Sequence, residues 1–312
     1  MYNGDLKKRF IEEREASAKL ADGYLRRIFT ETEAFEEVFG KDVSEFTTTE
    51  ILDYYKVKNS RSLEVLENLN SQLSAYTQWC FQQNLIADGI NHFNEINSEA
   101  MNSCVNKAAL QETILDRDQL LEIVGQLKNP RDRFVLMMLF ETGREKNFTN
   151  IFNTKISDFN LEENKVQLGD RCVDVSRELI NTAFLAADTD IYYTFSLNPK
   201  NIHHTQRNLA ESEFIYRETI QATNMEIKIR VHRLSSSIRA SLDAIGVKKS
   251  WTKLNSFSES GLIYHIKQLS KEKGIDPETL IKNQEYREML MQQHAINKII
   301  PASFLRKYGE YL

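Results

Sequence analysis

The sequence contains few residues that break helices and few that form covalent crosslinks. Its 312 residues include 4 prolines, 11 glycines and 3 cysteines. Scarce proline and glycine leave long stretches free to form helix. Cys80, Cys104 and Cys172 lie far apart and follow no CxxC spacing, which predicts reduced, buried thiols in a cytosolic protein and no metal or other cofactor.

The sequence also lacks the apolar segments that membrane proteins need. No apolar run approaches the ~20 residues that span a bilayer. The N-terminal stretch MYNGDLKKRFIEERE is too charged for a signal peptide. We therefore expect no membrane association and a location in the cytoplasm.

Net charge is −5, which by itself argues against a nucleic-acid partner. The charges are segregated, however. Residues 1–50 hold 12 acidic and 8 basic residues, whereas residues 225–253 hold seven Lys or Arg against two acids. Because phosphate contacts depend on local positive charge, the basic segment leaves a polyanionic partner open.

Apolar residues recur at helical spacing along most of the chain, which predicts a mainly α-helical protein. We expect one helix from about Leu6 to Phe29, a helix capped by Thr47 and a long amphipathic helix over residues 62–85. A further helix should begin at Pro130 and end at Gly143. The alternating runs around Gly169 and Asp170 predict a β-hairpin, with helices in the remainder.

The order of these segments resembles that of the tyrosine recombinases (phage integrases). "LNSQLSAYTQWCFQQNLI" is similar to a helix of their core-binding domain, and "RDRFVLMMLFETG" to the start of their catalytic domain. "HRLSSSIRASLDAIG" has the spacing of their second catalytic box, HxLRHTxAxxLxxxG. His232, Leu234, Leu242 and Gly246 fall in register.

This resemblance implies a mainly α fold with a small β-hairpin or sheet. It implies a helical core-binding-like DNA-binding domain at residues 1–100, a linker at 101–115 and a catalytically degenerate recombinase-like domain at 116–312.

The chemistry of that family is phosphoryl transfer, which depends on fixed positive charge around the phosphate. Here Ser235 stands at the position of the second-box arginine, and Ser236 at that of the following histidine. Arg144 lies one place early in the first box. Tyr308 is spaced more widely from the second box than the nucleophilic tyrosine usually is. We therefore interpret Arg144, His232, Ser235 and Tyr308 as a degenerate site without catalytic residues.

A recombinase scaffold without cleavage chemistry still implies a DNA clamp. The candidate DNA-binding residues are Lys56, Lys58, Arg61, Arg144, Lys146, Arg207, Arg230, His232, Arg233, Arg239, Lys248 and Lys249. A solvated helix face, a plain exposed loop at 54–62 and a buried structural His232 are the alternatives that the residues leave open. Adjacent His203 and His204 invite a zinc interpretation, but no cysteine or carboxylate lies at helical spacing nearby.

The resemblance implies, as the favoured hypothesis, a sequence-specific, DNA-binding transcriptional repressor of the type that maintains phage lysogeny, acting at operator sites on the nucleoid of a bacterial host. Two alternatives remain open. One is an active recombinase with rearranged residues, and the other is a regulator that binds a protein partner. The sequence leaves homo-oligomerisation on DNA undecided.

Overall fold

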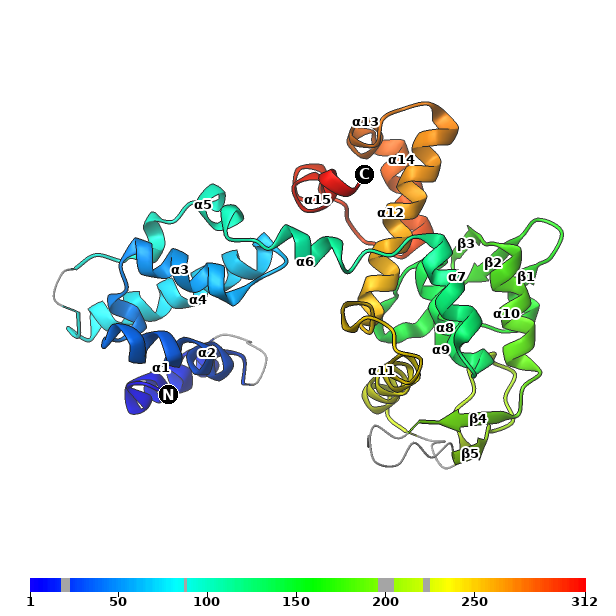
Figure 1. Cartoon of the computed structure of the whole chain (residues 1–312), viewed down its shortest axis with the longest axis horizontal. Helices are drawn as coiled ribbons and strands as arrows, with labels where there is room; N and C mark the ends of the chain where they lie inside the picture. Colours follow the sequence, from blue (N-terminus) through cyan, green and yellow to red (C-terminus); the bar gives the residue numbers. More distant parts are fainter. Residues whose placement is uncertain (18–22, 87–88, 196–204, 221–224) are drawn as a thin grey trace. The chain divides into compact units, whose positions relative to one another are not determined.

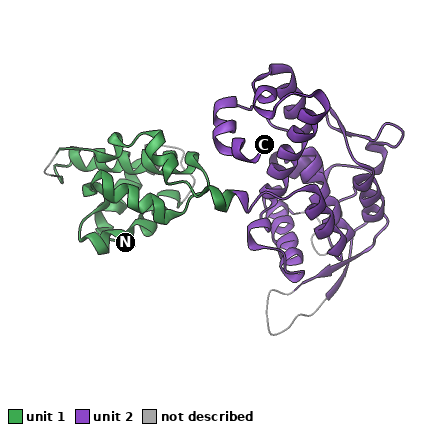
Figure 2. Cartoon of the chain, turned by 45° about the horizontal axis from the view of Figure 1, so that its top comes forward, with its two compact units in different colours: residues 1–110 green, residues 111–312 purple. Residues whose placement is uncertain are grey.

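The computed structural model describes residues 1–17, 23–86, 89–195, 205–220 and 225–312. The chain forms two compact units, residues 1–110 and 111–312, which Figure 2 shows in different colours. Each unit has its own hydrophobic core.

Unit 1 is helical throughout its described part. Its helices, drawn blue to cyan in Figure 1, are α1 (Gly4–Ser17), α2 (Tyr24–Phe39), α3 (Thr48–Lys58), α4 (Leu63–Gln82), α5 (Ser98–Ser103) and α6 (Lys107–Gln111), the last crossing the boundary between the units. The predicted amphipathic helix is confirmed as α4, with Leu66, Leu73 and Tyr76 fully buried. Thr47 caps α3 in a capping box with Glu50, as predicted.

The expectation of one helix over residues 6–29 is wrong. Helix α1 ends at Ser17, and α2 begins at Tyr24 and continues to Phe39. Gly23, the N-cap of α2, has φ 75°. This left-handed conformation does not continue a right-handed helix, so the chain turns before α2.

Two charged side chains lie in the core of unit 1. Lys7 and Glu36 are fully buried, and the Lys7 ammonium donates to Glu36 Oε2 at 2.6 Å. The backbone N–H of Val43 also donates to Glu36, at 2.8 Å. This buried pair links α1 to α2. Removing Lys7 would leave the Glu36 carboxylate without a cation, and removing Glu36 would leave the Lys7 ammonium with only Asp42, at 3.9 Å.

Part of the stretch expected to be a linker is helical. The end of α5 and all of α6 lie within the expected linker at 101–115, and Met101 and Cys104 are buried in the core of unit 1. The thiol prediction is wrong for one residue. Cys80 and Cys104 are buried, but Cys172 is exposed because it alternates on its strand with inward-facing Val173.

Unit 2 combines further helices with short strands. The helices are α7 (Arg117–Gln126), α8 (Pro130–Thr142), α9 (Thr149–Phe152), α10 (Arg177–Ala187), α11 (Ile227–Ala244), α12 (Leu254–Lys273), α13 (Pro277–Lys282), α14 (Gln284–His294) and α15 (Pro301–Tyr308). The strands are β1 (Phe159–Asn160), β2 (Lys165–Leu168), β3 (Arg171–Asp174), β4 (Ile191–Thr194) and β5 (Thr205–Asn208).

Helix α8 forms the centre of this unit. It begins with Pro130 at its first turn and is followed by Gly143, as predicted, and its residues 134–140 have no exposed surface. Helices α10 and α12 pack against it. Gly261 of α12 allows the closest approach, because a Cβ there would lie 1.7 Å from the carbonyl oxygen of Phe140.

The strands form two small antiparallel sheets. The predicted hairpin around Gly169 is confirmed as β2 and β3, with Val166 opposite Val173, and β1 extends it. The second hairpin, β4–β5, pairs Tyr192 with Arg207 and was not predicted. Every described side chain of β5 is exposed, so the strand lacks the alternating pattern that reveals strands in a sequence.

Helices α13 to α15 form a small cluster with the C-terminal half of α12. In Figure 1 this cluster and α11 lie at opposite ends of α12. None of the described helices has the length and apolar character needed to cross a bilayer.

Candidate nucleic-acid interface

Helix α11 carries the segment that resembles the second catalytic box. Leu234, Ile238 and Leu242 recur at helical spacing and are buried, which fixes the helix against the core of unit 2. His232, Arg233 and Arg239 are exposed on its other faces. The same periodicity that buries the leucines therefore presents the basic side chains to solvent.

Two serines of this segment, Ser235 and Ser237, donate hydrogen bonds to backbone carbonyls of their own helix. The Ser235 hydroxyl donates to the Val231 carbonyl at 2.9 Å, and the Ser237 hydroxyl donates to the Leu234 carbonyl at 3.0 Å. A serine at position 235 has no charge and only one donor, which is already engaged. It supplies none of the bidentate donors that an arginine directs at a phosphate.

The basic residues along and after α11 differ in how they are held. Arg230 lies over the Phe152 ring at 4.3 Å and contacts Glu218 at 3.4 Å. Lys248 lies 5.0 Å from the Trp251 ring centre. Within the described part of the chain, Arg233, Arg239 and Lys249 have no hydrogen-bond or ion-pair partner. These three side chains are available to an external anion.

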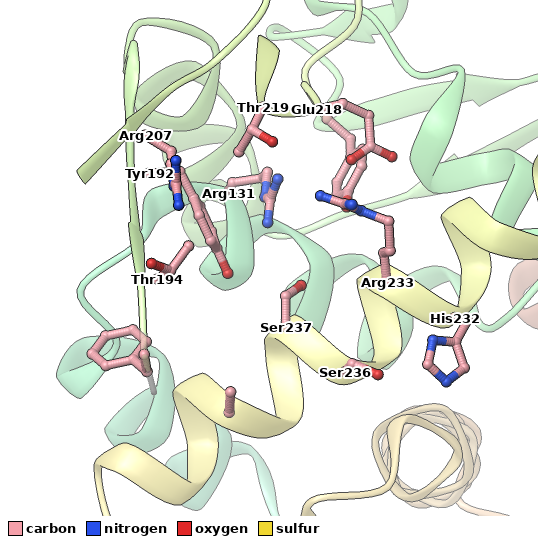
Figure 3. Close-up of a pocket in the computed structure, with 13 residues that line it drawn as sticks. Arg131, Tyr192, Thr194, Arg207, Glu218, Thr219, His232, Arg233, Ser236 and Ser237 are labelled. Atoms are coloured by element: carbon pink, nitrogen blue, oxygen red, sulfur yellow. The ribbon is translucent and has the colours of Figure 1, made fainter. Parts of the chain in front are cut away.

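A cavity of about 750 Å³ lies between α11 and the β4–β5 hairpin. Figure 3 shows Arg131 in the middle of it, with Tyr192 and Arg207 on one side and Arg233 on the other. The remaining lining residues are Thr194, Phe195, Tyr216, Glu218, Thr219, His232, Ser236, Ser237 and Ala240. Of the predicted site residues, the structure brings Arg207, His232 and Arg233 together here.

Arg131 is not among the site residues predicted from the sequence, where its segment was predicted only to form a helix. Its guanidinium carbon lies 3.7 Å from the Tyr192 ring centre and 4.7 Å from that of Tyr216. Nη1 donates to the Arg217 carbonyl at 3.0 Å, while Nε has no hydrogen-bond partner in the described structure. Burial opposes its charge, yet the surrounding groups, Tyr216 first among them, leave the pKa of Arg131 above its usual value.

Asp132, next to Arg131, connects three elements around the cavity through hydrogen bonds. Its Oδ2 accepts hydrogen bonds from the Tyr192 hydroxyl at 3.0 Å and the Ser241 hydroxyl at 2.6 Å, which connect α8, β4 and α11. Asn129 donates to the same oxygen at 3.1 Å. The sequence shows only three consecutive charged residues directly after Pro130, which do not reveal the contacts of Arg131 and Asp132 with distant residues.

The predicted first-box residues lie around a different cavity. Arg144 is exposed, donates to Asn255 and lies 4.5 Å from the Phe148 ring centre. Lys146 is exposed beside it, and both line this cavity together with His294. Arg171, in the β2–β3 turn region, is paired with Glu145 at 2.5 Å. The structure does not place Arg144 in the cavity that holds His232 and Arg233.

His294, which lines this second cavity, lies against a second histidine, His265. His265 Nδ1 lies 2.7 Å from His294 Nε2. Burial and the nearby Arg117 charge lower the pKa of His265 to about 4. Burial, followed by the influence of His265, lowers the pKa of His294 well below its usual value. Both imidazoles are therefore neutral at pH 7.

Tyr308 lies in the C-terminal helical cluster. Its side chain is buried, with 6% exposure, and its ring packs 4.9 Å from that of Phe304. Lys307, the residue before Tyr308, pairs with Glu259 of α12 at 3.1 Å, and Glu259 lines the cavity of Arg144. Tyr308 itself lines neither this cavity nor the one that holds His232 and Arg233.

The candidate residues of unit 1 lie on and after α3. Lys56 pairs with Asp53 at 3.0 Å, and Lys58 pairs with Glu31 of α2. Arg61 is half-buried between α3 and α4 and has no partner in the described part of unit 1. The expected loop at 54–62 is helical as far as Lys58.

No three histidine, cysteine or acidic side chains are grouped for a metal ion in the ranges that the structure describes. His203 and His204 lie outside those ranges.

Comparison with family models matches both units. Residues 114–308 match the model described as MrpR, C-terminal catalytic domain, and residues 1–82 match the model described as MrpR, N-terminal core-binding domain. This chain belongs to the MrpR family. The family is tyrosine-recombinase-like, so the fold expected from the sequence motifs is confirmed.

One relative of this MrpR-family chain is the Bacillus subtilis (strain 168) SPbeta prophage-derived uncharacterized protein YopR. It is 24% identical over 322 residues, which cover 96% of this chain and 94% of the relative. Among solved structures, a lambda integrase(75-356) dimer bound to a COC′ core site has a TM-score of 0.50 at 13% identity. That match covers 97% of this chain and 94% of the integrase chain.

Proposed function

We propose that this MrpR-family chain is a sequence-specific DNA-binding transcriptional repressor without recombinase activity. The observation that carries the proposal is the neutral Ser235, whose hydroxyl is bonded to the backbone of its own helix. Strand cleavage in the recombinase scaffold depends on a guanidinium at this position, as the resemblance of the second box implies. Loss of one such donor typically reduces the rate by a factor of about 100 or more.

The side chains of α11 support DNA as the partner. Arg233, Arg239 and Lys249 have no partner in the described part of the chain, and Arg230 is held partly exposed by Phe152 and Glu218. Lysine and arginine at a DNA surface neutralise phosphates and release bound counterions. Residues with no internal partner lose no ion pair when they bind, which favours these three as phosphate contacts.

Unit 1 supplies a second set of basic side chains. Arg61 has no described partner, whereas Lys56 and Lys58 must exchange their carboxylate partners for phosphates. We therefore assign Arg61 the larger part in DNA contact. In this proposal both domains bind one duplex, and a repressor bound across a promoter excludes polymerase.

The relatives are consistent with a phage regulator. The lambda integrase match is a complex with a core site, and the Bacillus relative is derived from the SPbeta prophage. We propose that the chain silences lytic genes of a prophage of this type in the bacterial cytoplasm. Homo-oligomerisation on the operator and a regulatory protein partner belong to the same proposal.

A gel-shift titration with promoter fragments from such a prophage tests this function. The proposal predicts preference for particular fragments over random duplex, with affinity that falls as salt is added. Binding with no site preference and no salt dependence would contradict it.

One observation favours an active recombinase as the second candidate. The family model that covers residues 114–308 is described as a catalytic domain. That activity would require Arg144, His232, Arg233 or Arg239, and Tyr308 to converge on one phosphate. In the structure, Arg144 and His232 line different cavities, and Tyr308 is buried in the C-terminal cluster.

A further inference from the structure

The cavity around Arg131 has features that neither predicted catalytic box supplies. Arg131, Tyr192 and Arg207 belong to α8, β4 and β5, outside both motifs. Ser235 and Arg144 are not among its lining residues. In Figure 3 His232 extends away from the other labelled side chains, while Arg233 and Ser237 are directed toward Arg131. The cavity shares His232 and Ser236 with the second box, but Ser235, at the position of the box's arginine, does not line it.

The charge of the lining is positive. Three arginines, Arg131, Arg207 and Arg233, face a single carboxylate, Glu218. That carboxylate is already contacted by Arg230, with Nε 3.4 Å from Oε1. Asp132 partly offsets Arg131, with Oδ1 3.6 Å from Nε, but Asp132 does not line the cavity. The net charge that remains attracts an anion.

Arg131 supplies a buried hydrogen-bond donor, its guanidinium, at the base of the cavity. The residue is 4% exposed, and two tyrosine rings hold its guanidinium in place. Both ring contacts involve the guanidinium carbon, and a guanidinium in contact with aromatic rings can still donate through its N–H groups. Only Nη1 has a protein acceptor in the described structure, and the buried Nε has none. A buried donor without a partner is costly, so an acceptor from outside would be stabilising.

Arg207 and Arg233 supply the other two guanidinium groups of the cavity, one on each side of Arg131. Both are exposed and have no partner within the described ranges. The hydroxyls of Thr219 and Ser236 add further donors, whereas the Thr194 hydroxyl already donates to the Thr205 carbonyl at 3.0 Å. The cavity of about 750 Å³ is within the range of small-molecule sites.

We propose that this cavity binds a phosphate group, held by Arg131 at the base and by Arg207 and Arg233 at the rim. Guanidinium groups match the tetrahedral oxygens of phosphate and donate charge-assisted hydrogen bonds to them. The phosphate belongs either to a small phosphorylated molecule or to the backbone of a bound duplex. The inference does not depend on the repressor proposal.

The first experiment uses the full chain without DNA and inorganic pyrophosphate as the probe, measured by isothermal titration calorimetry. Arg207→Gln and Arg233→Gln should each weaken pyrophosphate binding about tenfold, the loss expected for one charge-assisted contact. Arg306→Gln, at an exposed position of α15, is the matched control and should bind like the native chain. Arg131→Lys keeps the positive charge but lacks the planar guanidinium with its several donors. The midpoint of thermal unfolding of this variant reports whether it folds.

The second experiment separates the two sources of the phosphate. The titration is repeated with the native chain in the presence of excess promoter duplex. Displacement of pyrophosphate by the duplex assigns the cavity to a backbone phosphate. Retention assigns it to a small phosphorylated molecule.

Two results would overturn the inference. One is an absence of pyrophosphate binding to the native chain. The other is binding that Arg207→Gln and Arg233→Gln leave unchanged, or that Arg306→Gln weakens equally. Because the first titration contains no DNA, its failure is distinguishable from failure of the repressor proposal.

Discussion

The Ser235 hydroxyl donates a hydrogen bond to the Val231 carbonyl, one turn earlier in α11, at 2.9 Å. The side chain at the second-box arginine position is thus engaged with its own backbone. A change at this one position would not create an active site, because Tyr308 is buried in the C-terminal cluster and Arg144 lines another cavity.

Restoring the missing arginine is therefore expected to leave the chain inactive. Ser235→Arg should fold, since position 235 is only half-buried, and should still form no covalent adduct with a nicked suicide duplex. The measurement is denaturing electrophoresis of the reaction with labelled DNA. An adduct formed by Ser235→Arg would show that the remaining catalytic groups are in place, contrary to the structure.

Reversing the charge of the α11 region is expected to weaken DNA binding strongly. Arg230→Glu, Arg233→Glu and Lys249→Glu combined remove three candidate phosphate contacts. The slope of log affinity against log salt should become less steep by about 2.7, at about 0.9 per phosphate. Gel shifts at several salt concentrations measure this slope.

The matched control reverses three exposed lysines of the C-terminal half of α12, Lys267, Lys271 and Lys273. The net charge changes equally, but none of these residues is a candidate contact. An equal loss of affinity in both triple variants would attribute binding to total charge rather than to α11.

The close approach of α8 and α12 predicts a severe effect for a small substitution. Gly261→Ala places a methyl group 1.7 Å from the Phe140 carbonyl oxygen, so the helices must separate. We expect a loss of at least about 2 kcal/mol in the free energy of unfolding, as for overpacked cores. Urea denaturation measures it.

Gly125→Ala is the control for this change. A Cβ at Gly125, within α7, would have no other atom within 4 Å. This variant should be about as stable as the native chain or more stable by up to about 1 kcal/mol, because alanine favours helix. Similar destabilisation by both substitutions would contradict the packing described for α8 and α12.

The His265–His294 pair predicts loss of stability in acid. Both pKa values are lowered in the folded chain, that of His265 to about 4. Below about pH 6.5 the unfolded chain binds protons that the folded chain does not, so stability should fall as pH decreases toward 4. Each histidine contributes a slope of at most about 1.4 kcal/mol per pH unit. Chemical denaturation across this range measures the effect.

The double variant His265→Gln, His294→Gln isolates the contribution of this pair. Its stability should vary less between pH 6.5 and 4 than that of the native chain. An unchanged pH profile would show that other groups cause the acid sensitivity.

The helices of unit 2 show how much of the fold the sequence could predict. Pro130 and Gly143 marked the ends of α8, and the alternating residues around Gly169 marked the β2–β3 hairpin. These signals are local, and the structure follows them. The break between α1 and α2 was missed because apolar residues continue on both sides of Gly23, whose left-handed conformation separates the helices.

The candidate site was predictable only in part. The basic side chains of α11 follow from its helical period, and three of the predicted residues, Arg207, His232 and Arg233, line one cavity. Arg131 could not be found from sequence, because its partners Tyr192 and Tyr216 lie about 60 and 85 residues away along the chain. Only the tertiary fold brings those rings into contact with its guanidinium.

The loss of cleavage chemistry is tested most directly by incubating the purified native chain with a suicide duplex. This duplex contains a promoter site that the chain binds in the gel-shift titration. The account predicts specific binding in a native gel and no covalent protein–DNA adduct in a denaturing gel. A covalent adduct that disappears in Tyr308→Phe would contradict it and establish an active recombinase.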